Sequence, residues 1–226
     1  MRHRIIQRID YLVEACTGRT VLHLGCAGMP STQRRLADGT LLYSLIDRVA
    51  ARQHGVDLSR EGIEILQQAG YTNVAVADIQ LLREQNPFPG RHFDVILAGE
   101  IIEHLSNPGL FLEGLKPLLR DSPTCLILTT INAYCAYRFF YSLVMGDESV
   151  HPDHVSYYSK KTLLTLLTRH GYDVQQFCFY PIGREHKQYI NHGRARLLYW
   201  VDWLAGHLSP QLGDGLIVSC VLRSSP

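Results

Sequence analysis

The chain has 226 residues, of which 46% are apolar and 19% charged, and its formal net charge is +1. This composition excludes a disordered protein and allows one well-buried core. The near-neutral net charge argues against a broad, charge-driven surface for nucleic acid, but it permits a site for a single nucleotide.

The six cysteines are scattered without a CxxC pair, which excludes a zinc framework and a disulfide scaffold and suits a reducing compartment. The amino terminus has no signal-type apolar run, and no stretch reaches the roughly 20 apolar residues of a membrane span. We therefore expect a cytoplasmic protein without a membrane span.

Apolar runs of strand character alternate with amphipathic stretches along most of the chain. We expect strands at 20–24, 53–58, 73–77, from 93 onward, and at 125–130, 173–180 and 216–222. We expect helices at 5–15, 36–49 (with a turn at Asp38-Gly39), 61–69, 108–120, 161–170 and 194–207. This alternation predicts an α/β fold with a Rossmann-like, seven-stranded, mostly parallel sheet and helices on both faces.

Two segments interrupt this rhythm, at about 132–158 and 181–213, and both are rich in aromatic residues. Insertions near the carboxyl ends of strands are suitable places for a substrate lid. The alternative is additional core or a dimer face, so a homodimer is left open. We expect residues 1–226 to form a single domain that carries both insertions.

A polar cluster follows the fourth strand. Glu100, Glu103 and His104 are spaced i, i+3 and i+4, so a helix after Gly99 would place all three on one face. Open α/β sheets hold their ligands at the carboxyl ends of strands. We therefore expect the site at this edge of the sheet.

The first strand opens into a loop of small residues, Gly25-Cys26-Ala27-Gly28, which is typical of a nucleotide-binding turn before a helix. An ordinary strand–helix turn is the alternative. Asp57, at the end of the second strand, is in the position from which an acid binds ribose hydroxyls in dinucleotide-type folds. Cys26 is expected to pack, not to act as a nucleophile.

Several motifs together resemble the class I S-adenosylmethionine-dependent methyltransferases. They are Val21–Gly28, Gly55–Ser59, the strand-end Asp78, the run from Phe93 to Leu105, and His154–Leu163. The resemblance spans roughly residues 18 to 180. It implies that the methionine part of S-adenosyl-L-methionine lies along Gly25, Cys26 and Ala27. It also implies that Asp57 and Leu58 hold the ribose and that Asp78 and Ile79 flank the adenine. Ala98 is likewise implied to lie in the cofactor site.

The sequence departs from the family pattern at the first strand. The acid usual near its end is His23 here, and the second and third glycines of the usual loop are Ala27 and Met29. These departures concern the methionine end of the cofactor and leave the strand-two acid intact.

The Glu-x-x-Glu-His string with a later histidine is similar to two metal-dependent branches, the ubiquinone-pathway O-methyltransferases and the small-RNA 2′-O-methyltransferases. By that similarity Glu100, Glu103, His104 and His154 would bind Mg²⁺ or another divalent cation. Without a metal, His104 or His154 is the candidate general base. His151 and Asp153 are neighbours that could supplement this site, but we interpret them as solvated loop residues.

The function expected from these patterns is methyl transfer to a hydroxyl of a small metabolite or glycan, with nucleic acid a minor option. A Rossmann oxidoreductase is an alternative, but the missing third glycine and the long gap from Gly25 to Asp57 count against it. A non-catalytic binding module with this fold is the other alternative.

Overall fold

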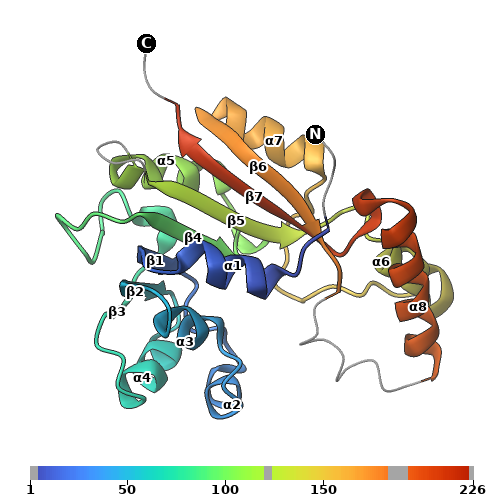
Figure 1. Ribbon diagram of the computed structural model, residues 1–226, viewed down its shortest axis with the longest axis horizontal. Coiled ribbons are helices and arrows are strands. Elements are labelled where there is room, and N and C mark those ends of the chain that lie inside the picture. Colours follow the sequence, from blue (N-terminus) through green and yellow to red (C-terminus); the bar gives the residue numbers. More distant parts are fainter. Residues whose placement is uncertain (1–4, 120–123, 183–192, 224–226) are drawn as a thin grey trace.

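The computed structural model of the protein describes residues 5–119, 124–182 and 193–223, with side chains in the last range described from residue 200. The strands form one mixed sheet in the order β3-β2-β1-β4-β5-β7-β6 (Figure 1). Their bounds are β1 (Thr20–Leu24), β2 (Arg52–Asp57), β3 (Val74–Val76), β4 (Val95–Gly99), β5 (Cys125–Ile131), β6 (Tyr172–Tyr180) and β7 (Gly215–Leu222).

The sheet is parallel except at one strand. β7 runs antiparallel to both β5 and β6, whereas the four strand pairs from β3 to β5 are parallel. The strand order reverses between β1 and β4, and the carboxyl ends of the strands around this switch point form a crevice that suits ligands. The predicted α/β, seven-stranded, mostly parallel sheet is confirmed.

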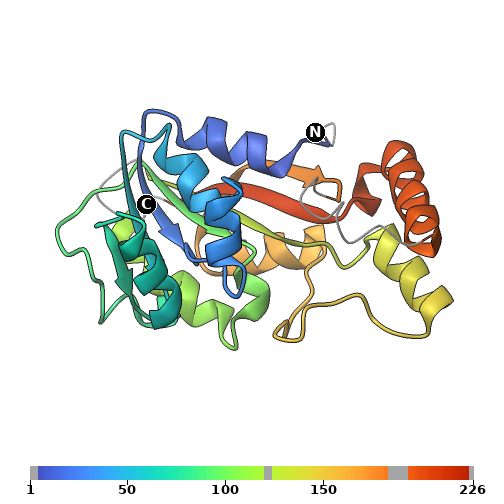
Figure 2. The same ribbon diagram turned by 90° about the horizontal axis from the view of Figure 1, so that it is seen from below.

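Helices cover both faces of the sheet. The described helices are α1 (Arg8–Cys16), α2 (Thr32–Ala37), α3 (Leu42–Asp47), α4 (Arg60–Gln68), α5 (Pro108–Leu119), α6 (Ala136–Met145), α7 (Lys160–Arg169) and α8 (Gly193–Leu208). α1 and α3 pack on one face, and α5 and α7 pack on the other (Figure 2). α4 packs against β2 and β3 at the edge.

The core is apolar because the central strands are continuously buried. β4 and β5 present Val95, Leu97 and Ile127 to α1 and α3, and Ile96 and Leu128 to α5 and α7. Alternate side chains of a strand point to opposite faces, so a central parallel strand needs apolar residues at every position. This is why the sequence pattern located these strands.

Two predicted elements differ from the structure. The stretch expected to be helical over 36–49 begins earlier, because α2 starts at Thr32, whereas the turn expected at Asp38-Gly39 is present and separates α2 from α3, with Gly39 at a left-handed φ of +66°. The helix expected after Gly99 is a single 3₁₀ turn, η2 (Ile102–His104), and Glu100 lies outside it with a φ of 55°.

The two aromatic segments each contain a helix, α6 and α8, and these helices pack against each other beyond the end of the sheet (Figures 1 and 2). Both carry large exposed apolar side chains, including Phe139, Leu143, Trp200 and Leu204. The boundaries of the single domain and the lid role of the insertions stay predictions.

Candidate active site

A cavity of about 1080 Å³ opens at the carboxyl ends of β1, β2 and β4. It extends from the loop after β1 to the loop before α7, and α6 also contributes to its wall. Lining residues from the sequence-predicted site are Gly25, Cys26, Asp57, Leu58, Asp78, Ile79, Glu100, His104 and His154. Most of the predicted site residues therefore share one cavity.

The loop after β1 has a backbone that only glycine permits at its first position. Gly25 has a φ of +70°, and a Cβ there would collide with the side chain of Ile101. The next residue, Cys26, is buried with its sulfur directly over Gly55, and burial raises the pKa of its thiol. Cys26 is thus a packing residue beside the cavity, and its protonated thiol is a poor nucleophile.

Asp57 is fixed by backbone donors at the end of β2. The N–H of Ala27 donates to Oδ2 of Asp57 and the N–H of Ser59 donates to Oδ1, both at 2.9 Å. Each carboxylate oxygen accepts more than one hydrogen bond. The oriented carboxylate can therefore still bind a pair of vicinal hydroxyls that enters the cavity.

The predicted adenine side is formed by a short turn after β3. Asp78 caps η1 (Ile79–Leu81) by accepting a hydrogen bond from the N–H of Gln80 at 2.9 Å. Ile79 is largely buried but lines the cavity beside it. Ala98, in contrast, is fully buried in the core and does not line the cavity.

Glu100 lies at the floor of the cavity in a strained backbone conformation. Its Oε1 accepts hydrogen bonds from the hydroxyls of Tyr180 (2.6 Å) and Thr129 (3.1 Å), and its N–H donates to the carbonyl of Thr129. A non-glycine residue at positive φ costs roughly 1–2 kcal/mol, so the surrounding contacts must hold it there. Gly215 makes this possible, because a Cβ at that position would collide with the ring of Tyr180.

Glu103 is fully buried and does not line the cavity. Its Oε2 accepts a hydrogen bond from the Thr130 hydroxyl at 2.9 Å, and its Oε1 has no hydrogen-bond partner among the described residues. Burial, with the nearby charge of Glu100, raises the pKa of Glu103 to about 8. The carboxyl group is therefore neutral over much of the physiological range.

Glu103 also organises the loop opposite it through its backbone. Its carbonyl oxygen accepts hydrogen bonds from the N–H groups of Val155 (2.9 Å) and Ser156 (3.2 Å). Two residues of the distant loop are thus tied to η2. This contact explains why His154, the residue before them, reaches His104.

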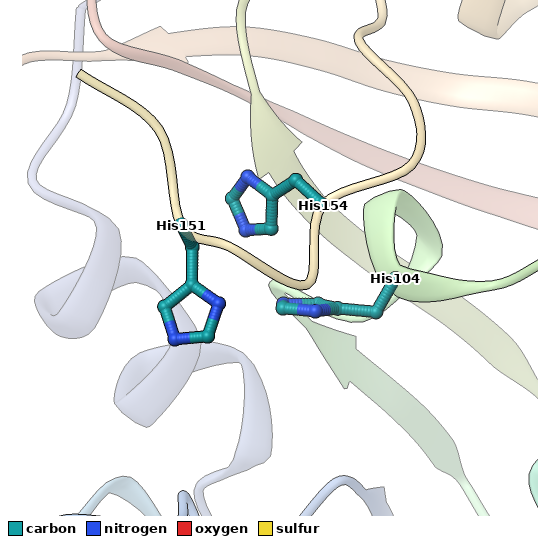
Figure 3. Close-up of side chains that lie close together, drawn as sticks. All are labelled: His104, His151 and His154. Carbon is teal, nitrogen blue, oxygen red and sulfur yellow. The ribbon is translucent and has the colours of Figure 1, made fainter. Parts of the chain in front are cut away.

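The structure brings three imidazoles together at the cavity wall (Figure 3). The ring centroids of His104 and His154 are 4.5 Å apart, and His151 is 5.5 Å from each of them. Burial and the neighbouring histidines lower the pKa of His154 to about 4, and burial followed by His151 lowers the pKa of His104. His104 and His154 are therefore neutral near pH 7 and able to accept a proton.

The acidic and imidazole members of the predicted cluster do not share one face. Glu100 turns toward Tyr180 and Thr129, Glu103 turns into the core toward Thr130, and only His104 meets His154. The prediction assumed a helix, and η2 is too short and begins too late to align the two carboxylates with the imidazole. His151, interpreted from sequence as a solvated loop residue, is exposed on its loop and is also the third member of the histidine group.

Residues 1–176 match the family described as methyltransferase domain. The chain belongs to this family. It is 24% identical over 152 residues to a ubiquinone biosynthesis O-methyltransferase of Actinobacillus pleuropneumoniae, a match that covers 63% of this chain and 59% of that protein. It is 30% identical over 115 residues to a mitochondrial ubiquinone biosynthesis O-methyltransferase of Arabidopsis thaliana, covering 50% and 35%. The matches thus span less than two thirds of the length of these relatives.

Solved structures show the same fold. An S-adenosylmethionine-dependent methyltransferase from Archaeoglobus fulgidus aligns with a TM-score of 0.58 and 17% identity over 95% of this chain and 91% of that one. The small RNA methyltransferase HEN1 aligns with a TM-score of 0.61 and 18% identity over 96% of this chain and 25% of that one. The chain thus has the class I S-adenosylmethionine-dependent methyltransferase fold, as the sequence motifs predicted.

Two arginines, Arg8 and Arg138, also line the cavity. No sequence pattern singles them out. Arg8, at the start of α1, lies with its guanidinium 5.8 Å from the centre of the Tyr180 ring. Its Nη1 would be 3.7 Å from a Cβ at Gly99, so it reaches the end of β4. A cation in the first turn of an amphipathic helix carries no sequence signal that distinguishes it from a solvated residue.

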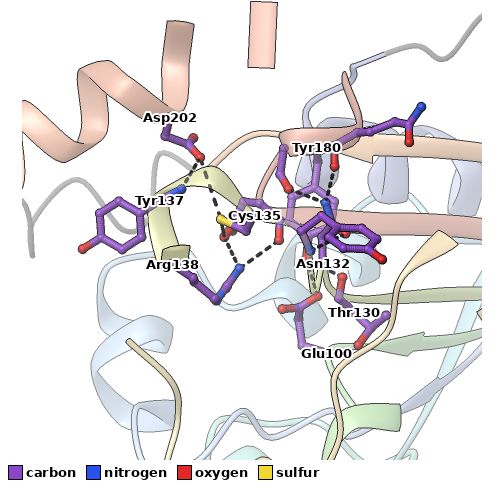
Figure 4. Close-up of polar contacts among 12 residues, drawn as sticks. Glu100, Thr130, Asn132, Cys135, Tyr137, Arg138, Tyr180 and Asp202 are labelled. Atoms are coloured by element: carbon purple, nitrogen blue, oxygen red, sulfur yellow. Dashed lines mark hydrogen bonds and ion pairs between the residues drawn. The ribbon is translucent and has the colours of Figure 1, made fainter. Parts of the chain in front are cut away.

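The second arginine, Arg138 of α6, belongs to a buried network between the two insertions (Figure 4). It forms an ion pair with Asp214 at 2.8 Å and donates to the Asp214 carbonyl at 3.0 Å. Asp202 of α8 accepts hydrogen bonds from the N–H of Tyr137 (3.4 Å) and the thiol of Cys135 (3.8 Å). Burial, and then the charge of Asp214, raise the pKa of Asp202 to about 6.

Asn132 connects the same insertions to the sheet. Its Nδ2 donates to the carbonyls of Gln211 and Gly213, each at 2.8 Å, and its N–H donates to the carbonyl of Asp214 at 2.9 Å. Asn132 also bridges to Tyr158 at the end of the first insertion.

Among the helices that the structure describes, none is both long and apolar enough to cross a bilayer.

Proposed function

We propose that this methyltransferase transfers the methyl group of S-adenosyl-L-methionine to a hydroxyl oxygen of a small acceptor. The observation that carries the proposal is the single cavity, which joins the Gly25 loop and Asp57 at one end to the His104–His154 pair at the other. A methyl donor bound by the Gly25 loop and Asp57 would therefore share the cavity with imidazoles that can take a proton from the acceptor.

The cofactor end of the cavity suits each part of S-adenosylmethionine. Asp57 is oriented for the ribose hydroxyls by its two backbone donors. Asp78 and Ile79 offer an acceptor and an apolar surface for the adenine. The guanidinium of Arg8 supplies a positive charge for the cofactor carboxylate beside the Gly25 loop. His23 cannot replace the usual acid, because an imidazole carries no negative charge in either protonation state. Burial lowers the pKa of His23 to about 3, so the ring is neutral.

The bound cofactor supplies an electrophilic methyl group on a positively charged sulfur. The chain positions the acceptor hydroxyl, and a neutral imidazole of His104 or His154 removes its proton as the oxygen–carbon bond forms and the sulfur–carbon bond breaks. Glu100, held by Tyr180 and Thr129, acts on His104 in the direction that raises the pKa of this imidazole and so favours uptake of the proton.

The four ligands that the family resemblance implies do not fit a common divalent ion in this structure. Glu103 is buried behind the cavity wall, and Oε1 of Glu100 already accepts two hydrogen bonds. The two imidazoles do converge. A site made of Glu100, Glu103, His104 and His154 stays a prediction, and no step is derived through it.

The acceptor is proposed to be a small molecule with adjacent hydroxyls. Relatives are named as ubiquinone biosynthesis O-methyltransferases, so catechols are the first acceptors to test. The net charge of +1 is unlike a protein that binds RNA mainly through phosphates. A cytoplasmic location and a homodimer are left as predictions.

Two measurements test the proposal. Titration calorimetry should show S-adenosylhomocysteine binding that Asp57→Ala weakens by roughly a hundredfold, because hydrogen bonds to a charged carboxylate are lost and the N–H groups of Ala27 and Ser59 are left unpaired. Asp38→Asn serves as the control, because Asp38 is an exposed acid at the C-cap of α2.

Radiolabelled methyl transfer to a panel of catechols should fall in His104→Asn or His154→Asn, with cofactor binding unchanged. Absence of cofactor binding to the wild-type protein overturns the proposal, and binding without transfer to any acceptor would indicate a non-catalytic module.

A further inference from the structure

We propose that His104, His151 and His154 form a three-imidazole site for a divalent transition-metal ion such as Zn²⁺, with His151 as a ligand that the family resemblance does not supply. One ligand nitrogen from each histidine lies within 4.8 Å of the others. The inference concerns the acceptor end of the proposed active-site cavity, but it depends on metal binding and not on methyl transfer.

The geometry is close to that of a bound metal. Zinc–nitrogen bonds of about 2.0–2.1 Å in a tetrahedral site place the ligand nitrogens roughly 3.3 Å apart. The longest separation among the three nitrogens therefore has to shorten by at most about 1.5 Å. His151 is exposed on a loop, so a change of its side-chain rotamer can provide this movement.

Two of the histidines are positioned by one turn. The N–H of His154 donates to the carbonyl of His151 at 3.1 Å, and the loop that follows is tied to Glu103 through Val155 and Ser156. The turn brings the rings of His151 and His154 to one side, facing His104 from η2 (Figure 3). The three side chains are thus arranged by backbone contacts that do not depend on a metal.

A second observation points to a ligand at this group. Nδ1 of His154 is buried and has no hydrogen-bond partner among the residues that the structure describes. An unsatisfied buried nitrogen is destabilising, and a coordinated cation would satisfy it. The backbone N–H of Asp153 donates to Nδ1 of His151 at 3.3 Å, which orients that ring on the turn.

The donor set selects the type of metal. Imidazole nitrogens suit Zn²⁺, Ni²⁺, Co²⁺ or Fe²⁺, whereas Mg²⁺ prefers oxygen ligands in octahedral geometry. Neither Glu100 nor Glu103 belongs to the histidine group in the structure. A three-histidine set leaves further coordination positions open toward the cavity, where the oxygen of an acceptor can bind. With the ion bound, His104 and His154 would act as ligands and not as the base, and the ion would lower the pKa of the bound hydroxyl in their place.

The experiment measures metal binding to the full chain after removal of metals with a chelator. Zn²⁺ and Mg²⁺ are titrated by calorimetry, and Co²⁺ binding is followed by its visible absorption, which reports nitrogen coordination. We expect one Zn²⁺ per chain, bound at least about a hundredfold more tightly than Mg²⁺. His151→Asn should weaken Zn²⁺ binding about tenfold or more and change the Co²⁺ spectrum.

Two matched variants separate this site from the alternatives. His92→Asn removes an exposed histidine from the loop before β4 and should leave Zn²⁺ affinity unchanged. Glu103→Gln removes the buried carboxylate of the family-type set and should have little effect on Zn²⁺ affinity. Unchanged affinity in His151→Asn, or Mg²⁺ binding as tight as Zn²⁺ and lost in Glu103→Gln, overturns the inference. Thermal unfolding of each variant excludes loss of the fold as the cause.

Failure of this inference and failure of the proposed function are distinguishable. S-adenosylhomocysteine binding without Zn²⁺ binding overturns only the metal site. Zn²⁺ binding that depends on His151, in a protein that binds no S-adenosylhomocysteine, supports the metal site and overturns only the proposed function.

Discussion

The two ends of the cavity are held by different kinds of contact. At the cofactor end, backbone N–H groups orient Asp57, and a glycine at positive φ opens the loop after β1. At the acceptor end, backbone contacts set the histidine turn, but the charged groups are held by other side chains: Tyr180 binds Glu100, and Arg138 pairs with Asp214. Backbone contacts depend little on side-chain identity, whereas side-chain pairs change with each substitution. The first end therefore suits a shared cofactor and the second a particular acceptor.

The family match follows the same division. Residues 1–176 include the strands that surround the cofactor end, whereas α8 and β7 lie beyond the matched range. The predictions below ask whether damage at the acceptor end leaves the cofactor end intact.

The largest effect is expected at Gly215. Gly215→Ala places a methyl group where the Tyr180 ring lies, and overpacking of this kind costs about 1–3 kcal/mol. Because Tyr180 must then move away from Glu100, methyl transfer should fall together with the free energy of unfolding, measured by urea denaturation. Gly114→Ala in α5 is the matched control, since its nearest neighbour is an unstrained 3.7 Å away and alanine favours a helix. Equal stability of the two variants would contradict the steric argument.

The contact between α6 and α8 should depend on pH through Asp202. Its pKa is raised from 3.8 to about 6 in the folded protein, so between these values the unfolded chain has released a proton that the folded protein retains. The contribution of this group to the free energy of unfolding is therefore present below pH 3.8 and lost as the pH rises to about 6, by about 3 kcal/mol.

The groups that face Asp202 are Asp214, Arg138, the thiol of Cys135 and the N–H of Tyr137. Asp202→Asn should remove this part of the pH dependence and stabilise the protein above pH 6, as measured by urea unfolding across the pH range. Asp38→Asn, at an exposed acid, provides the reference for the other carboxyl groups. A pH profile identical to wild type would show that Asp202 has the same pKa in the folded and the unfolded protein, and would contradict the prediction.

The smallest effect is expected from Tyr180→Phe. It removes the 2.6 Å hydrogen bond to Glu100, worth about 1–2 kcal/mol, so kcat for methyl transfer should fall roughly tenfold while S-adenosylhomocysteine affinity is unchanged. Tyr172→Phe is the matched control, because it loses a 2.6 Å hydrogen bond to the Leu112 carbonyl, which is not part of the cavity. The control should lose stability without losing kcat. Weakened cofactor binding in Tyr180→Phe would show that the two ends are coupled.

Local patterns were sufficient to predict the sheet and most of the cofactor end. Central strands are apolar at every position, and Gly25 and Asp57 follow strands directly, so neighbouring residues carry the signal. The Glu100 geometry could not be predicted in this way, because its left-handed φ is stabilised by Thr129 and Tyr180, residues distant in sequence. The approach of His151 to His104 likewise depends on a turn that is fixed by Glu103.

Asn132 has a consequence for how this protein can vary. The first insertion begins at Asn132 and returns beside it at Tyr158, and the second returns at Gly213 and Asp214, which its side chain and N–H also bind. Both insertions are thus attached to the sheet through one residue. We therefore expect the two insertions to be exchangeable as a pair for those of a relative only when the asparagine at position 132 is retained.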